Sequence, residues 1–207
     1  MKKIGEGWQY GVYDLENGRV LKKFHSFIKS YWVILTTIFP FRDDPMVMIP
    51  DFSRSMKRKA LVSFEILKRR QIPPAWIGNP KFLNELDFEQ DKVRPLHDVF
   101  STCDVDTAKR TIDKFVEFNK RLLEMGVIDK SFNITKNFGL DENNEIVLLD
   151  IGELFDDPTR IRKQLQDRAW AKKYVADCIG NEETRNYFVR QMDANFKNIF
   201  PIGKESS

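Results

Sequence analysis

The chain begins with short runs in which apolar and polar residues alternate. The runs "GVYDL" and "RVLKKF" lie on either side of "ENG", a sequence typical of a hairpin turn. Three glycines, Gly5, Gly7 and Gly11, lie at or before the first of these runs. We therefore expect short strands joined by tight turns between Ile4 and His25.

The spacing of apolar residues then changes to that of a helix. In "SRSMKRKALVSFEILKRRQ" the apolar residues recur every three or four positions, Ser53 or Ser55 offers an N-cap, and "IPPAWIGNP" ends the segment. A longer helix is predicted from Asp106 to Gly126. Its stripe consists of Ile112, Phe115, Val116, Asn119, Leu122 and Leu123.

The remaining pattern predicts how strands and helices are divided along the chain. A strand pair is expected in 81–96 and a buried strand in 146–149, and 157–180 and 181–200 have helical spacing. This order predicts an α+β protein whose first lobe, 1–95, holds a sheet and one helix, and whose second lobe, 96–207, is mostly helical. The boundary should lie between Arg94 and Asp98.

An apolar insertion, 26–50, separates the early strands from the first helix. Its most hydrophobic part, "YWVILTTIFPF" from Tyr31 to Phe41, has eleven residues, whereas a membrane span needs about 20. A buried helix or strand is the simpler interpretation of 31–41. Contact with a membrane surface or with a partner protein is the alternative.

Composition narrows the possible functions. The chain has 34 basic and 31 acidic residues and a formal net charge of only +3, which gives no basis for nucleic-acid binding. Its 17 Phe and 4 Trp can form a sizeable core. Cys103 and Cys178 read as reduced thiols of a cytoplasmic protein, and His25 and His97 lack the spacing of a zinc site. The start has two lysines but no apolar run typical of a signal peptide.

Five motifs follow one another in a recognisable order. They are the glycine-rich "IGEGWQYGVY", the strand "RVLKKF" with Lys22, the helix with Glu65, the segment "LDFEQDKVRPL", and a loop ending at Asn137 that precedes Asp150-Ile151-Gly152 by thirteen residues. In this order and spacing the chain resembles the protein-kinase-like phosphotransferase superfamily. The resemblance extends to the small bacterial members that phosphorylate sugars or other small molecules, and it covers roughly Ile4 to Phe155.

The resemblance implies a nucleotide site in the first lobe. Gly5, Gly7 and Gly11 would form the loop over the phosphates of ATP, although Gly11 comes one residue late for the family spacing. Lys22 would contact the α- and β-phosphates, and Glu65 would form an ion pair with that lysine. Backbone groups of the hinge from Asp91 to Arg94, in particular those of Asp91 and Val93, would bind adenine.

The resemblance also implies a magnesium site. Asn137 and Asp150 correspond to the two metal-binding residues of the family, with Ile151 in place of the usual phenylalanine. A carboxylate and an amide oxygen are ligands that Mg²⁺ accepts. ATP and Mg²⁺ are therefore the expected cofactors.

The catalytic base departs from the family pattern. The family places an aspartate five residues before the asparagine, but this chain has Phe132 there and no His-x-Asp motif. The nearest carboxylate is Asp129, eight residues before Asn137, with Asn133 midway. Either Asp129 is the base of a rearranged loop, or the base is missing and the protein is a pseudokinase.

Three functional hypotheses remain open. After Gly152 the chain enters a helical segment without a long activation segment or an Ala-Pro-Glu motif, which favours a small molecule, glycan or lipid hydroxyl over a peptide as the acceptor. The alternative is a pseudokinase that binds nucleotide or holds a partner. The third is an α+β domain whose motifs match by chance. We favour the kinase.

Overall fold

The structure is a computed structural model that describes all residues except 8, 27–28, 30–44, 173–178, 198 and 200–207. Segment 31–41 and Cys178 therefore lie outside the described residues. The strands are β1 (Lys2–Glu6), β2 (Tyr10–Asp14), β3 (Arg19–Phe24), β4 (Lys81–Phe82), β5 (Phe88–Asp91), β6 (Arg94–Pro95), β7 (Ile128–Asp129), β8 (Phe138–Leu140), β9 (Ile146–Leu148) and β10 (Leu154–Phe155). The helices are α2 (Pro45–Arg69), α3 (Leu96–Thr102), α4 (Val105–Glu124), α5 (Ile134–Asn137), α6 (Pro158–Gln166) and α8 (Glu182–Phe196), with 3-10 turns η2 (Pro74–Ile77) and η3 (Ala169–Ala171).

The α+β class is confirmed. Strands β1 to β5 form an antiparallel sheet in the order β1-β2-β3-β5-β4. The turn between β2 and β3 uses Glu16 at φ 61° and Gly18 at φ 80°, so the predicted "ENG" turn forms where the left-handed backbone is required. The sheet is joined to a smaller one, β6-β8-β9, by the short connection after β5.

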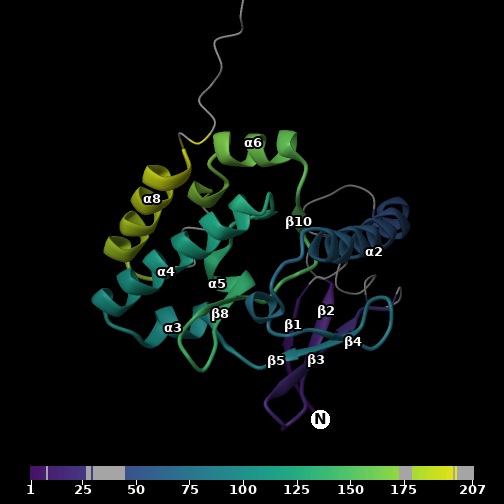
Figure 1. The fold of residues 1–207 in the computed structure, drawn as a ribbon. Coiled ribbons are helices and arrows are strands. Elements are labelled where there is room, and N and C mark those ends of the chain that lie inside the picture. Colours follow the sequence, from purple (N-terminus) through teal and green to yellow (C-terminus); the bar gives the residue numbers. More distant parts are fainter. Residues whose placement is uncertain (8, 27–28, 30–44, 173–178, 198, 200–207) are drawn as a thin grey trace, which may run out of the picture.

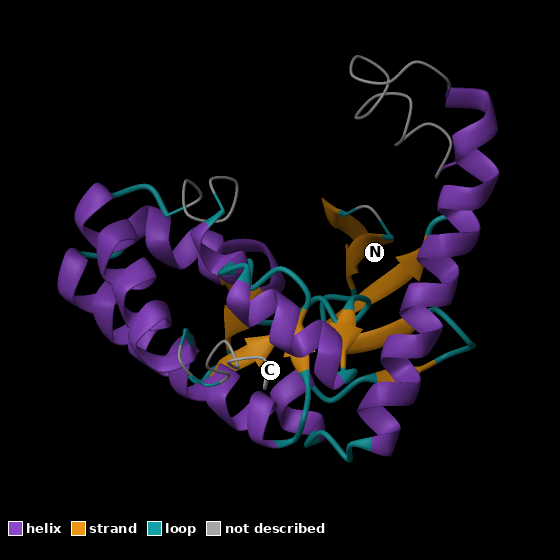
Figure 2. Ribbon diagram, turned by 90° about the horizontal axis from the view of Figure 1, so that it is seen from above, coloured by secondary structure: helices purple, strands orange, loops and turns teal. Residues whose placement is uncertain are grey.

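Helix α2 packs on the sheet through aromatic contacts. The Phe64 ring lies 4.9 Å from that of Phe82 and 5.7 Å from that of Phe88, both in edge-on geometry. Phe88 also meets Tyr10 at 5.5 Å, so one cluster joins the helix to three strands. Figure 2 shows the long α2 flanking the strands, with the other helices gathered at the opposite end.

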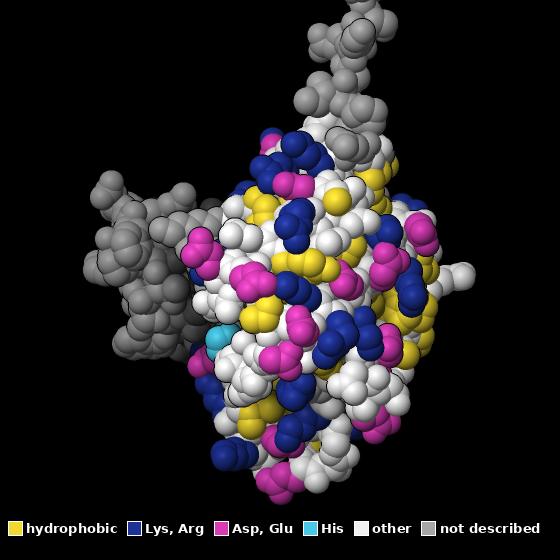
Figure 3. Space-filling view, turned by 90° about the vertical axis from the view of Figure 1, so that its left-hand side faces the viewer, with side chains coloured by type: hydrophobic (Ala, Val, Ile, Leu, Met, Phe, Trp, Pro, Cys, Tyr) yellow, Lys and Arg dark blue, Asp and Glu magenta, His cyan; other side chains and the backbone are white. Residues whose placement is uncertain are grey.

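The helices α4 and α8 lie side by side at that end (Figure 1). The fully buried Phe115 of α4 contacts Phe138 of β8 at 4.8 Å and Phe188 of α8 at 5.9 Å. This core fixes β8 and β9 against the helices. On the face that these helices form, Lys and Arg side chains are interspersed with Asp and Glu (Figure 3).

Two predicted helix boundaries were wrong, and one helix was missed. Helix α2 begins at Pro45 and not at Ser53 or Ser55, because proline is tolerated at the first position of a helix and need not end the preceding segment. Helix α3 was not predicted at all. The segment 157–180 is not one continuous helix, since α6 ends at Gln166 and Arg168 adopts a left-handed φ of 47° before η3.

No helix within the described residues is long and apolar enough to cross a membrane.

Gly139 allows a close backbone approach where β6 pairs with β8. A Cβ at this position would lie 2.6 Å from Val93 Cγ2 and 2.8 Å from the Arg94 carbonyl oxygen. Arg94 pairs with Leu140 and Pro95 with Gly139, so the strand carrying Gly139 is in direct contact with the connection between the two sheets.

We predict that Gly139→Ala lowers the free energy of unfolding by about 1–3 kcal/mol, because the added methyl must displace backbone. Urea denaturation of the purified variant measures this change. Gly180→Ala is the matched control, since a Cβ there meets nothing within 4 Å. Equal stability of the two variants would contradict the close approach.

Candidate active site

Asp129 is a fully buried carboxylate at the end of β7. The strand pairs with β10, where Asp129 is opposite Leu154. Its Oδ1 accepts a hydrogen bond of 2.9 Å from Asn137 Nδ2, and its Oδ2 accepts bonds of 3.1 and 3.2 Å from the backbone N and the Oγ of Ser131. The carboxylate is therefore held in a fixed orientation.

Burial raises the pKa of Asp129 to about 7, because the charged form loses water. The nearby Asp150 carboxylate raises it further, while the hydrogen bonds from Asn137 and Ser131 act in the opposite direction. A carboxyl group with this pKa can exchange a proton near neutral pH, which is what a general base requires.

The loop after Asp129 is anchored by Phe132. This residue has a left-handed φ of 50° and no solvent exposure, and its ring meets Trp170 edge-on at 5.7 Å. Asn133 then caps α5, because its side chain accepts a hydrogen bond from the backbone N of Lys136. The position five residues before Asn137 is thus a core anchor, and the polar group in the loop comes from Asp129.

Asn137 joins this loop to the Asp-Ile-Gly segment. Its backbone carbonyl accepts hydrogen bonds from Leu149 N at 2.7 Å and from Asp150 N at 3.2 Å. Asp150 is half-buried, and its Oδ1 accepts a bond of 3.2 Å from Gly152 N. Burial raises the pKa of Asp150, and the positive charge of Lys22 partly offsets that rise.

Lys22 approaches the same place from β3. It is only 9% exposed, its ammonium donates a hydrogen bond to the Leu149 carbonyl, and it lies 5.8 Å from the centre of the Phe88 ring. Burial lowers the pKa of Lys22 to about 8, although the Asp150 carboxylate favours its charged form. Lys22, Asp129, Asn137 and Asp150 are therefore brought together.

The predicted ion pair between Lys22 and Glu65 does not form. Glu65 is exposed on α2, and no salt bridge joins these two described residues. The reason is helical phase: the positions of α2 that reach the site are Met56, Lys59 and Ser63, and Glu65 is rotated about 200° from Ser63.

A different charge network connects α2 to the loop. Glu153 directly follows the Asp-Ile-Gly segment. Its Oε1 lies 3.3 Å from the Nζ of Lys59 on α2 and 3.0 Å from the Nζ of Lys130, the neighbour of Asp129. Ser63 also accepts a hydrogen bond of 2.9 Å from Leu154 N. Sequence reasoning missed Glu153, Lys59, Lys130 and Ser131, although Lys130 is next to the predicted Asp129.

The glycine-rich turn is a tight hairpin. Gly5 lies in β1 and Gly11 in β2, and Gly7 N donates a hydrogen bond of 2.8 Å to the Tyr10 carbonyl. His25 secures the turn, since its backbone N bonds to the Gln9 carbonyl and its Nε2 lies 2.9 Å from the Gly7 carbonyl oxygen. None of these three glycines has a positive φ, so the turn itself does not require glycine for its backbone conformation.

The expected hinge residues lie at the junction of the two sheets. The Asp91 carboxylate accepts hydrogen bonds from Arg19 Nη1 and, at 2.6 Å, from Asn79 Nδ2. The backbone N of Asp91 donates a hydrogen bond to the Gly78 carbonyl. The side chain of Val93 lies against Gly139. The Asp91 side chain therefore stabilises the sheet, and binding of adenine by the backbone of Asp91 and Val93 stays a prediction.

Metal binding would depend on few protein ligands. Within the part of the chain that is described, no group of three or more His, Cys, Asp or Glu residues could hold a metal ion. Mg²⁺ is commonly bound through one or two carboxylates together with phosphates and water, so Asn137 and Asp150 are sufficient in type.

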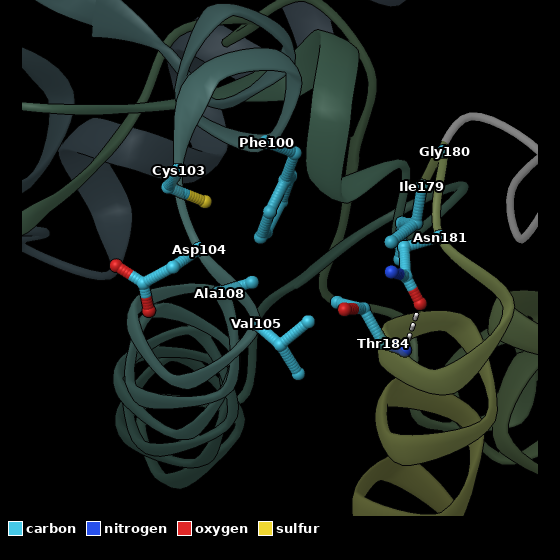
Figure 4. A pocket seen from close by; sticks show the side chains of 9 residues that line it. All are labelled: Phe100, Cys103, Asp104, Val105, Ala108, Ile179, Gly180, Asn181 and Thr184. Atoms are coloured by element: carbon cyan, nitrogen blue, oxygen red, sulfur yellow. Dashed lines mark hydrogen bonds between the residues drawn. The ribbon is translucent and has the colours of Figure 1, made fainter.

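A small pocket of about 40 Å³ lies elsewhere, between α3, α4 and the start of α8 (Figure 4). Cys103, Phe100 and Thr184 are among the residues that line it. The figure shows Asn181 Oδ1 bonded to the Thr184 backbone nitrogen, which is a helix cap. None of the residues lining this pocket belongs to the cluster around Asp129.

We predict that Asp129 makes stability fall as pH rises. Its pKa is higher in the folded state than the ordinary value of 3.8, so the folded state binds more protons between about pH 4 and pH 7. In Asp129→Asn this contribution is absent. Relative to the wild type, the free energy of unfolding of this variant should increase by on the order of 4 kcal/mol between pH 4 and pH 8.

Urea denaturation at several pH values measures this difference, in which contributions shared by both proteins cancel. Gln166→Asn, exposed at the end of α6, changes no titratable group and should parallel the wild type at every pH. An Asp129→Asn curve that also runs parallel would show that Asp129 titrates as an ordinary carboxyl group.

Comparison with known proteins adds little. No protein-family model matches the chain, and no curated protein matches it. Among solved structures, the bifunctional kinase-methyltransferase WbdD aligns with a TM-score of 0.44 and 12% sequence identity. The alignment covers 86% of this chain and 41% of that chain, so this chain spans less than half the length of that protein. A similarity of this size supports no functional conclusion by itself.

Proposed function

We propose that the protein is an ATP-dependent phosphotransferase with a two-lobed, protein-kinase-like fold. The observation that carries this proposal is the convergence of Lys22, Asp129, Asn137 and Asp150. Asn137 donates to Asp129 through its side chain and accepts from Asp150 through its backbone, and Lys22 bonds to the residue next to Asp150. These residues also follow one another in the order of the kinase motifs.

Lys22 would bind the phosphates of ATP. The Lys22 side chain is buried where it reaches from β3 to the Leu149 carbonyl. A desolvated charge interacts more strongly with a phosphate than an exposed charge does. With a pKa of about 8, Lys22 is mostly protonated at neutral pH and loses its charge as the pH rises above that value. Nucleotide affinity should therefore weaken in alkaline solution.

Asn137 and Asp150 would hold Mg²⁺. Among the described residues, neither Asn137 Oδ1 nor Asp150 Oδ2 accepts a hydrogen bond, so each has a free oxygen of the type that Mg²⁺ prefers. When bound, the cation neutralises charge on the transferring phosphoryl group. The hydrogen bond from Gly152 N keeps the Asp150 carboxylate in a defined orientation.

Asp129 would accept the proton of the acceptor hydroxyl, which requires its loop to open, because the carboxylate is fully buried and its two oxygens accept three hydrogen bonds. As the acceptor oxygen forms its bond to the γ-phosphorus, the bond from that phosphorus to the bridging oxygen breaks and ADP leaves. The proton of the hydroxyl passes to Asp129. A pKa of about 7 keeps a large fraction of Asp129 ionised at neutral pH while leaving it basic enough for this step.

The acceptor is proposed to be a small molecule, a glycan or a lipid head group. Only the short β10 and a few loop residues separate Gly152 from α6, which begins at Pro158. This segment is too short to form the platform on which an extended peptide would lie.

The absence of a Lys22–Glu65 pair favours a second candidate, a nucleotide-binding pseudokinase. In active kinases such a pair positions the lysine. Here Lys22 is positioned instead by the Leu149 carbonyl and the charge of Asp150. Both candidates require nucleotide binding, and only the first requires turnover.

We predict that Mg²⁺ with ATP raises the melting temperature of the wild type, because a ligand that binds only the folded state stabilises it. Asp150→Asn should abolish the part of the shift that depends on Mg²⁺, and Lys22→Met should reduce the nucleotide shift. Glu142→Gln, exposed in the turn after β8, is the control and should respond like the wild type. A wild type that shows no shift would exclude both candidates.

A further prediction separates the kinase from the pseudokinase. Phosphorylated product should form from ATP and a panel of sugars, polyols and lipid head groups, and the rate should increase with pH up to about 7 as Asp129 ionises. Asp129→Ala and Asp129→Asn should lower the turnover by about 10²–10⁴ and leave ATP affinity within a few-fold. Undiminished transfer in both variants would rule out Asp129 as the base, and nucleotide binding without transfer would support the pseudokinase.

A further inference from the structure

The glycine-rich turn carries a buried polar side chain, Gln9, that reaches the Asp-Ile-Gly segment. Gln9 is only 6% exposed although it lies in a hairpin turn. Its Nε2 is 3.5 Å from the Gly152 carbonyl oxygen and 3.6 Å from the sulfur of Met56 on α2. The side chain therefore connects the turn to two other parts of the candidate site.

The orientation of the Gln9 amide follows from its contacts. The Gly152 carbonyl can only accept a hydrogen bond, so the amide nitrogen must be on that side. This leaves Oε1 buried and without a hydrogen-bond partner in the part of the chain that the structure describes. Buried amide oxygens almost always have a donor or a cation next to them, and an exception needs an explanation.

The unpaired oxygen lies beside Asp150. A Cβ built on Gly152 would overlap Gln9 Oε1 at 2.0 Å and contact Asp150 Oδ1 at 3.4 Å, so the two oxygens lie no more than about 5.4 Å apart. Two acceptors of partial or full negative charge repel each other unless a positive group lies between them. The charge of Lys22 acts on the Asp150 carboxylate, but the ammonium donates its hydrogen bond to the Leu149 carbonyl and none to Gln9 Oε1.

We propose that Gln9 Oε1 is a third protein oxygen for the divalent cation of Asp150 and Asn137. This inference rests on the proposed function, because it places Gln9 in the same cation site. An amide oxygen, a carboxylate oxygen and a second amide oxygen form a hard-donor set suited to Mg²⁺ or Mn²⁺. The cation would then hold the glycine-rich turn directly against the Asp-Ile-Gly segment.

The turn is built to keep Gln9 in this place. The Gln9 carbonyl accepts a hydrogen bond of 2.9 Å from His25 N, and Gly7 is held by the His25 ring. Gly152 leaves room for Gln9, since a side chain at that position would overlap Oε1 in its present place.

The test measures Mn²⁺ affinity by electron paramagnetic resonance, with Mn²⁺ alone and with Mn²⁺ plus ADP, without any turnover. Gln9→Leu removes the oxygen and should weaken Mn²⁺ binding by about tenfold, as losses around metal sites typically do. Gln9→Glu replaces the amide oxygen with a carboxylate at nearly constant size and should tighten binding by a similar factor. Gln166→Glu, exposed at the end of α6, is the charge control and should match the wild type.

The outcomes are distinct. Opposite changes in the two Gln9 variants support the proposal, and Gln9→Glu keeps the test valid if Gln9→Leu fails to fold. Unchanged Mn²⁺ affinity in both variants overturns it, as does weaker binding in Gln9→Glu, which would show that a carboxylate at this position does not reach the cation. Asp150→Asn separates the two proposals. If Asp150→Asn loses Mn²⁺ affinity while the Gln9 variants keep theirs, only the role of Gln9 fails. If Asp150→Asn keeps its Mn²⁺ affinity, the cation site itself fails.

Discussion

The hydrogen bonds of Asn137 are the interaction on which the candidate site depends. Its side-chain amide orients the buried Asp129, and its backbone carbonyl receives the N–H groups of Leu149 and Asp150. One residue thus fixes the distance between a carboxylate on β7 and a carboxylate after β9. Loss of either set of bonds would leave a buried acceptor or donor unpaired, which proteins tolerate poorly.

The charges of the site are balanced only in part. Burial and the Asp150 carboxylate raise the pKa of Asp129. Burial also raises the pKa of Asp150, and the Lys22 ammonium partly offsets that rise, while burial lowers the pKa of Lys22 itself. Around this centre, Glu153 links Lys59 and Lys130. Oxygens that accept no hydrogen bond from the described residues remain on Gln9, Asn137 and Asp150. A site with spare oxygens and buried opposite charges is suited to a cation and a polyanion together.

Much of the local structure could be predicted from hydrophobic spacing. The strands around "ENG" and the stripe of α4 show the period of their element, and β9 is a continuous apolar run. All three form as expected. The boundaries near Pro45 and Arg168 could not be predicted, because proline fits the first turn of a helix and a left-handed residue has no clear sequence signal. The short α3 was missed for lack of a repeating pattern.

For the site, the sequence by itself determined which residues follow one another: the glycine-rich turn, Lys22, the loop of Asp129 and Asn137, and Asp150 at the end of an apolar strand. Only the tertiary structure decided which of them meet. The phase of α2 turns Glu65 to solvent and brings Lys59 and Ser63 inward, and the fold places Gln9 against Gly152, 143 residues away. Spacing along a chain specifies neighbours within one element, but contacts between elements depend on how each helix and strand is rotated when it packs.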